Sequence, residues 1–202
     1  MTYLIEQALR TSIQALNWVD KYAGVVVPHL DKSKSPALLY PISAYNSDPS
    51  CSESADPFTP MTPDDGFKSV VYWEYRNGST VDVSEHRFNP VTESLRFVAW
   101  INPKKQGVTP AYGLSSIYAQ DFISRIAAVQ QVTVLNIPIT INTTRARIIQ
   151  VDASEVFGKY AYGDKEHLFV QPFEWFAIDF DFSVTVPKNC ASLITIGTEI
   201  DC

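Results

Sequence analysis

The chain has 202 residues and a mass of 22.6 kDa, and 46% of the residues are hydrophobic. A chain of this length hides about 70% of its extended surface on folding, enough for one core without disulfides or metal ions. The chain has 16 Lys and Arg and 22 Asp and Glu, which gives a net charge of −6. This charge argues against a protein that binds DNA or RNA through clustered cations. With 12% aromatic residues, the chain as a whole is not of the disordered class.

The first residues, the hydropathy and the cysteines together indicate the cellular compartment in which the chain is made. Residues 1–6 lack the basic and apolar regions of a secretory signal, and no apolar run approaches the ~20 residues of a membrane span. Three cysteines with no Cys-x-x-Cys spacing indicate free thiols made in a cytosol rather than a disulfide framework or a zinc site. They are Cys51, Cys190 and Cys202, and whether Cys190 and Cys202 pair stays open.

Residues 4–18 predict an amphipathic helix that lies on a core. The apolar positions recur at helical spacing, namely Ile5, Leu9, Ile13 and Leu16. Glu6 and Arg10 fall on the other side and are expected to face solvent. The β-branched run 24–27 then predicts a strand that stops at Pro28, and 37–42 predicts an edge strand because Pro41 cannot donate to a ladder.

Residues 46–66 predict an extended acidic loop within a single domain that spans 1–202. The stretch holds four prolines and five acidic residues, and it contains neither Lys nor Arg. A loop of this length in a compact domain is often functional and can become ordered only against a neighbouring molecule. Within it, Asp56, Pro57 and Phe58 are candidate assembly-interface residues, and Asp64 and Asp65 are expected to form a turn.

The middle of the chain is rich in predicted strands. Residues 69–75 and 80–83 flank Asn77-Gly78, and this pair predicts a β-hairpin because both positions accept positive φ. Residues 95–101 are nearly all apolar and predict a central strand. A second amphipathic helix is expected from Ser115 or Ser116 to Gln130, followed by strands over 132–141 and 146–151. Its inner face consists of Tyr118, Phe122, Ile126 and Val129.

The clearest pattern occupies residues 176–186, where apolar and polar side chains alternate. Six apolar residues at every second position predict a long strand with one heavily apolar face and one acidic, solvated face that carries Asp179 and Asp181. The order of elements indicates an α+β fold, a mostly antiparallel β-sheet with two amphipathic helices packed on it.

Few residues suggest chemistry, and we identify no catalytic residue, cofactor site or metal site. The three histidines, His29, His86 and His167, are expected at strand ends or in charged loops, without a nucleophile motif. No glycine-rich phosphate loop is present. Asp179 and Asp181 stand about 7 Å apart on one strand face and could hold a divalent cation, but the alternation favours solvent-side residues.

Two further groups of residues could bind a partner molecule or a ligand. Arg145 and Arg147 alternate onto one strand face and could meet an acidic partner, although a solvated edge is favoured. The aromatic residues could form the floor of a carbohydrate site, but packing in a core or an interface is favoured. They are Tyr72, Trp73, Tyr75, Trp100, Trp175 and Phe176.

The element order resembles that of the tail-terminator and neck-ring subunits of tailed double-stranded DNA bacteriophages. The resemblance rests on the helix of residues 4–18, the central strand with Phe97-Val98-Ala99-Trp100-Ile101-Asn102-Pro103, the helix of 116–130, and the closing strand with Phe176-Ala177-Ile178-Asp179-Phe180-Asp181-Phe182. The loop of 46–66 is longer than is usual in this family.

The resemblance implies a non-enzymatic virion protein, assembled in the host cytoplasm. Such a subunit forms a cyclic homo-oligomeric ring that joins the portal or connector to the tail, and DNA passes through it without specific binding. The candidate assembly residues are then Asp56, Pro57, Phe58, Arg145, Arg147, Asp179 and Asp181. The alternatives are a β-rich module that binds glycans or other ligands, and a metal-dependent hydrolase or transferase that uses the Asp-x-Asp pair.

Overall fold

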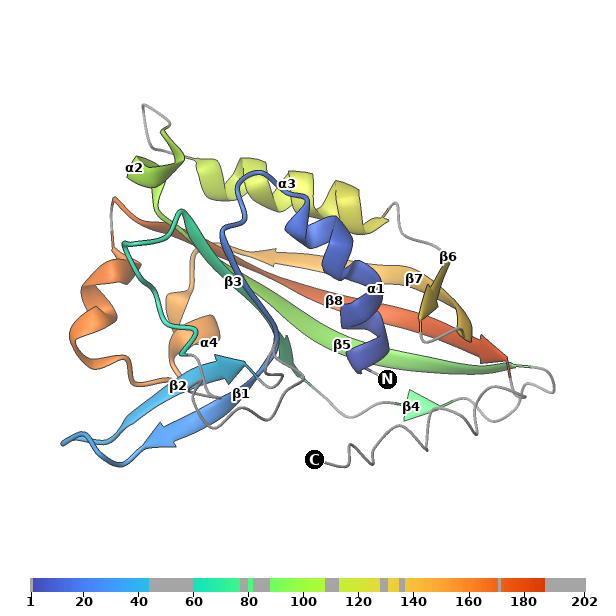
Figure 1. Cartoon of the computed structure of the whole chain (residues 1–202), viewed down its shortest axis with the longest axis horizontal. Coiled ribbons are helices and arrows are strands. Elements are labelled where there is room, and N and C mark those ends of the chain that lie inside the picture. Colours follow the sequence, from blue (N-terminus) through green and yellow to red (C-terminus); the bar gives the residue numbers. More distant parts are fainter. Residues whose placement is uncertain are drawn as a thin grey trace, which may run out of the picture.

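The computed structural model describes residues 2–43, 60–76, 80–81, 88–107, 113–127, 131–134, 137–170 and 172–187. Within these residues, one eight-stranded, mostly antiparallel sheet carries two amphipathic helices on one face (Figure 1). This arrangement confirms the predicted α+β fold class. A shorter helical segment covers part of the opposite face, so the sheet lies between two cores.

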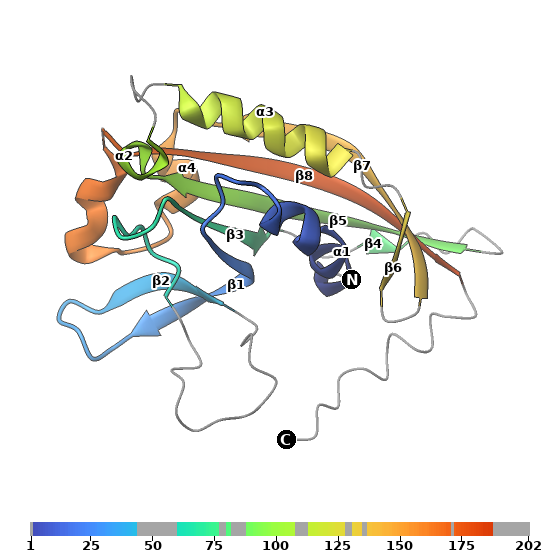
Figure 2. The ribbon, with the colours of Figure 1, turned by 45° about the horizontal axis from the view of Figure 1, so that its top comes forward.

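The helices differ in length and in the face of the sheet that they cover. They are α1 (Thr2–Gln14), α2 (Pro103–Gln106), α3 (Leu114–Ala127), α4 (Ala153–Phe157) and the 3-10 helix η1 (Gly163–Phe169). The helices α1 and α3 are the two that the sequence predicts, and they lie together on one face (Figure 2). α4 and η1, which no pattern in the sequence predicts, pack on the other face.

The strands follow the order β2-β1-β3-β5-β8-β7-β6, and β4 pairs with β5 beyond the end of β3. They are β1 (Lys21–Asp31), β2 (Leu38–Ser43), β3 (Ser69–Tyr75), β4 (Thr80–Val81), β5 (Phe88–Ile101), β6 (Gln131–Val134), β7 (Ile137–Ile149) and β8 (Glu174–Pro187). Of these pairings, β1–β3 is parallel and the others are antiparallel. The strand of residues 95–101 is central and β2 lies at an edge, as predicted.

The larger core lies between the sheet and the helices α1 and α3. The apolar positions of β8 that face it are fully buried, as the alternation predicts: Phe176, Ile178, Phe180, Phe182 and Val184. Phe97 of β5 stacks on Phe122 of α3, with ring centroids 3.7 Å apart and an interplanar angle of 16°. After the end of α1, the indole N–H of Trp18 donates to Asp121, which ties the two helices together.

The opposite face of the sheet is not the solvated surface that the alternation predicts. Val156, Phe157 and Leu168 of the α4–η1 segment bury Trp100, Ala177 and their neighbours in a second core. The polar side of β8 is covered at this end, and Asp179 is only 8% exposed. The prediction of a solvated polar face was wrong at this end of β8. The helices α4 and η1, which cover it, are too short to show a helical period in the sequence.

Two predicted connections also differ in the structure. Residues 69–75 and 80–81 do not pair as a hairpin, because both run antiparallel to β5, Tyr75 opposite Leu95 and Thr80 opposite Thr92. Conversely, the single strand predicted over 132–141 is a hairpin in which β6 pairs with β7, Val134 opposite Ile137. The strand predicted over 146–151 is the second half of β7.

Two smaller predictions, the end of β1 and the exposure of Glu6 on α1, were also wrong. β1 does not stop at Pro28 but continues to Asp31, and Pro28 lies opposite Pro41 of β2. Glu6, predicted to face solvent, is fully buried. Its carboxylate accepts hydrogen bonds from Arg10, one turn later, and from the hydroxyl of Tyr22, 2.8 Å away on β1.

Candidate functional site

The candidate residues fall into two groups. Asp56, Pro57 and Phe58 lie outside the described residues, as do His86 and all three cysteines. The structure places the other candidates on the adjacent strands β7 and β8, as two register pairs: Arg145 opposite Asp181 and Arg147 opposite Asp179. Each arginine is therefore opposite an acidic residue in the β7–β8 register, and Arg147 forms an ion pair with Asp179.

Asp179 is the centre of a buried ion network. Its two oxygens accept hydrogen bonds from Nε of Arg96 at 2.6 Å and from Nη2 of Arg96 at 3.1 Å. Arg96 is directly opposite Asp179 in the β5–β8 pair and is 5% exposed. A bidentate arginine–carboxylate pair in this geometry is among the strongest polar contacts in proteins.

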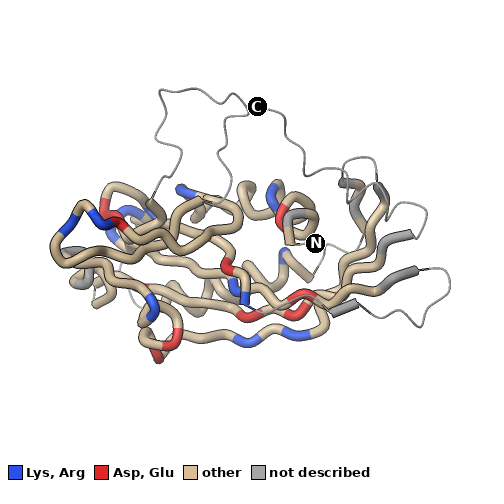
Figure 3. Tube along the Cα trace, turned by 90° about the horizontal axis from the view of Figure 1, so that it is seen from below, with Lys and Arg blue, Asp and Glu red and all other residues tan. Residues whose placement is uncertain are grey.

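Three more side chains complete the network. Arg76 hydrogen-bonds to Asp179, Arg147 lies 3.8 Å from it, and Glu155 of α4 pairs with both Arg96 and Arg147. Burial alone would lower the pKa of Arg96, but the hydrogen bonds and the negative charge of Asp179 outweigh it and raise the pKa. The two carboxylates therefore offset two of the three arginine charges, and acidic and basic positions are interspersed along the strands (Figure 3).

Asp181 is less enclosed than Asp179 and has a different partner. The hydroxyl of Ser94 donates to it at 2.6 Å, and it is half-buried. In the described residues no three His, Cys, Asp or Glu side chains lie close enough to hold a metal ion. Because Asp179 is bound to arginines, the Asp-x-Asp spacing does not leave both carboxylates open to a cation.

His29, near a strand end, and the turn at Asp64 lie where they are predicted from the sequence, and His167 lies on a short 3-10 helix. His29 lies near the end of β1, with its ring 5.6 Å from that of Tyr40, and His167 is an exposed residue of η1. The carboxylate of Asp64 accepts the N–H of Gly66, which closes the predicted turn.

Most of the aromatic side chains that were candidates for a carbohydrate site are buried. Tyr72, Trp73 and Trp100 are at most 2% exposed and belong to the two cores. Trp175 is 8% exposed, and it is the one of these candidates that lines a described pocket. Packing therefore accounts for the aromatic residues of β3 and β5 except Tyr75 at the end of β3, which is 46% exposed.

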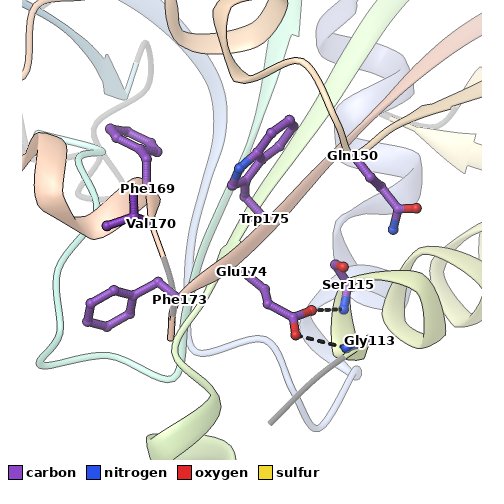
Figure 4. A pocket seen from close by; sticks show the side chains of 8 residues that line it. All are labelled: Gly113, Ser115, Gln150, Phe169, Val170, Phe173, Glu174 and Trp175. Carbon is purple, nitrogen blue, oxygen red and sulfur yellow. Dashed lines mark hydrogen bonds between the residues drawn. The ribbon is translucent and has the colours of Figure 1, made fainter.

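The pocket has a volume of about 540 Å³ and lies where the starts of β8 and α3 meet the end of η1 (Figure 4). Its lining consists of Gly113, Ser115, Gln150, Phe169, Val170, Phe173, Glu174 and Trp175. One side is aromatic, and Val170 on this side is 61% exposed. The other side is polar, and its centre is the carboxylate of Glu174.

Glu174 closes the first turn of α3. Its two oxygens accept the backbone N–H groups of Gly113 at 2.9 Å and Ser115 at 2.7 Å. These are donors that a helix N-terminus leaves without intrahelical partners. The cap thus comes from β8 and not from Ser115 or Ser116, the predicted caps. Among the described residues, no Lys, Arg or His side chain forms an ion pair with this carboxylate.

A second surface of interest is the outer part of the β1–β2 hairpin, residues 27–41, which we call the hairpin arm. The pairing of β1 with β3 ends at Val26, and beyond this point the hairpin projects from the rest of the sheet (Figures 1 and 2). Val27 and Leu30 on it are 43% and 49% exposed. Lys32 and Lys34 are exposed at its tip.

Comparison with known proteins does not identify the chain. No protein-family model matches it, and no curated protein matches its sequence. In the described part of the chain, no helix has the length and apolar character needed to cross a bilayer. The sequence gives no signal for a site at Glu174, Val170 or the hairpin arm, because none of them belongs to a periodic pattern or a known motif.

Proposed function

We propose that this chain is a structural virion protein. It is a subunit of a homo-oligomeric ring at the neck of a tailed double-stranded DNA bacteriophage, where the ring joins the portal or connector to the tail around the DNA channel. The family is suggested by the resemblance in element order. The observation that carries the proposal is that exposed apolar side chains lie at several separate places on the surface. Among them are Val27 and Leu30 on opposite faces of the hairpin arm, Val170 at the pocket, and Ile117 and Val151 elsewhere.

Two different contact surfaces on one chain, the hairpin arm and the pocket, favour head-to-tail association of copies. A two-fold dimer uses the same patch on both copies, whereas a contact between unlike patches repeats from copy to copy. Such a series closes into a ring when the rotation between neighbours divides a full turn. Covering an exposed apolar side chain with a neighbouring copy removes its surface from water, so we take the hairpin arm and the pocket as the contact regions.

The charges of the chain support a passive conduit rather than a DNA-binding surface. The net charge is −6, and Arg76, Arg96 and Arg147, which could have met phosphates, are paired with Asp179 or Glu155. A channel lined by a chain of this kind repels the DNA backbone at long range, which lets DNA slide without adhering.

The test is the mass and shape of the purified full-length protein. Native mass spectrometry at micromolar concentration is expected to show one large oligomer, and electron microscopy of the same sample is expected to show rings. Monomers at every concentration, in both low and physiological salt, would contradict the proposal.

A ligand-binding module is the second candidate, and the pocket with Trp175 favours it. An aromatic wall opposite Gln150 and Glu174 is the arrangement that binds a sugar ring, with the apolar face stacked and the hydroxyls hydrogen-bonded. A thermal-shift screen with neutral mono- and oligosaccharides tests it. A stabilising sugar whose effect is lost in Gln150→Ala supports the module, and no shift with any sugar removes it.

A further inference from the structure

We propose that the hairpin arm of one copy of this chain occupies the pocket of the next copy. This inference rests on the proposed ring function and names the two surfaces that meet. The arm offers the exposed apolar side chain of Leu30, which lies closer to its tip than Val27 and on the opposite face, and the pocket offers the aromatic wall around Phe169 and Phe173. Their contact removes apolar surface from water on both copies.

The charges of the two surfaces are complementary. The tip of the arm carries Lys32 and Lys34, both exposed, and the polar side of the pocket carries the carboxylate of Glu174. In the described residues this carboxylate accepts only backbone N–H groups and has no cationic partner. An arriving ammonium group would form a charge-assisted hydrogen bond there, close to the apolar contact.

The arm of the same copy is held away from its own pocket. Leu39 of the arm and Ala161 exchange two backbone hydrogen bonds, of 3.2 and 2.7 Å, which fix the arm beside the start of η1. The pocket lies at the other end of η1, where Phe169 and Val170 line it. The tip of the arm and the start of α3 lie on opposite sides of the α4–η1 segment in both views (Figures 1 and 2). The occupant is therefore the arm of a neighbour.

The first experiment is disulfide trapping between two variants of the full chain. In a background with Cys51, Cys190 and Cys202 replaced by serine, one variant carries Leu30→Cys and the other Val170→Cys. After the two are mixed and mildly oxidised, a covalent dimer is expected that neither variant forms alone to the same extent. Tyr75→Cys, 46% exposed and outside both surfaces, is the matched control and is expected to give no dimer with Val170→Cys.

The second experiment is the assembly of charge variants. Leu30→Asp and Val170→Asp are each expected to shift the protein from ring to monomer at concentrations where the parent is fully assembled, whereas Tyr75→Asp leaves the ring intact. An unchanged circular dichroism spectrum and a cooperative unfolding transition show that the variants fold, while a dissociated variant is expected to unfold at a lower midpoint than the assembled parent.

The outcomes separate the inference from the function on which it rests. Parent rings with no trapped dimer, and rings that survive both aspartate variants, would leave the ring function standing and overturn the arm–pocket contact. A monomeric parent would overturn both. A disulfide formed within one chain carrying both cysteines, at a dilution where only monomers exist, would mean that the arm fills its own pocket and would also overturn the inference.

Discussion

Replacing Asp179 with asparagine tests whether the buried ion network stabilises the sheet. The carboxylate is 8% exposed and holds Arg96, whose side chain is 6% exposed, through bonds of 2.6 and 3.1 Å. Removing one partner of a buried ion pair costs about 3–5 kcal/mol, because the other charge stays buried without compensation. Glu155 still lies 3.2 Å from Arg96, so the lower end, about 3 kcal/mol, is expected for Asp179→Asn.

The assay is urea unfolding followed by tryptophan fluorescence, at one protein concentration so that assembly contributes equally to all variants. For a chain of this size, about 3 kcal/mol corresponds to a fall in melting temperature of roughly 6–12 °C. Asp181→Asn is the matched control, since it lies on the same face and its amide still accepts from Ser94. Its expected cost is below about 1 kcal/mol. Equal losses for the two variants would refute the assignment of Asp179 as the centre of the network.

Three other changes are expected to have measurable effects. Glu174→Gln removes the charge that caps α3 and is expected to cost about 1 kcal/mol in urea unfolding; no loss would mean that the cap is not needed. Gly158→Ala places a Cβ atom 2.5 Å from the carbonyl oxygen of Ser154, so a loss of about 1–3 kcal/mol is expected in thermal unfolding, and an unchanged midpoint would refute the clash. Burial raises the pKa of Tyr22 and of Tyr72 above the ordinary 10.0, so their protons stay on in the folded chain. The contribution of each tyrosine to the free energy of unfolding is therefore fully present below pH 10 and is lost as the pH rises above 10, by about 1.4 kcal/mol per pH unit. Tyrosinate absorbance and unfolding at alkaline pH measure this loss.

The parts of the fold that the sequence predicts correctly are those that local periodicity determines. A period of two places Phe176, Ile178 and Phe180 on one side of a strand whatever lies around it, and the structure buries all three. In the same way, helical spacing identifies Leu9 and Phe122 as core positions of α1 and α3. These patterns are properties of the backbone and need no tertiary information.

The environment of Asp179 could not be derived from periodicity. Its partner Arg96 is 83 residues away, and the segment that covers it, α4 with η1, is too short to show a helical period. One signal was present, because Arg96 is the single charge in the apolar run of residues 95–101. A lone charge in a central strand needs an opposite charge on a neighbouring strand, and β8 carries acidic residues on its polar side.

The predicted hairpin at Asn77-Gly78 was wrong for a related reason. A turn sequence favours local pairing, but β5 offers a partner of 14 residues to both β3 and β4. Long apolar pairing outweighs a two-residue preference. The pocket had even less signal in the sequence, because Glu174, Val170 and Ser115 come together only where three segments converge.

The proposed ring would need a fixed rotation between copies, and the β5–β8 pair is the most regular part of the described sheet. Its 14 register pairs run without a bulge from Phe88 opposite Pro187 to Ile101 opposite Glu174. At that second end begins the strand that contributes to the pocket, and on the other side of β5 the strands β3 and β1 lead to the hairpin arm. Both proposed contact surfaces are attached to this sheet, the pocket directly through β8 and the arm through β3 and β1, whose pairing shifts register between Tyr22 and Val25. We therefore expect the sheet to set the rotation from one copy to the next. A fixed rotation is the condition for closure, because a variable one would give open chains of mixed length.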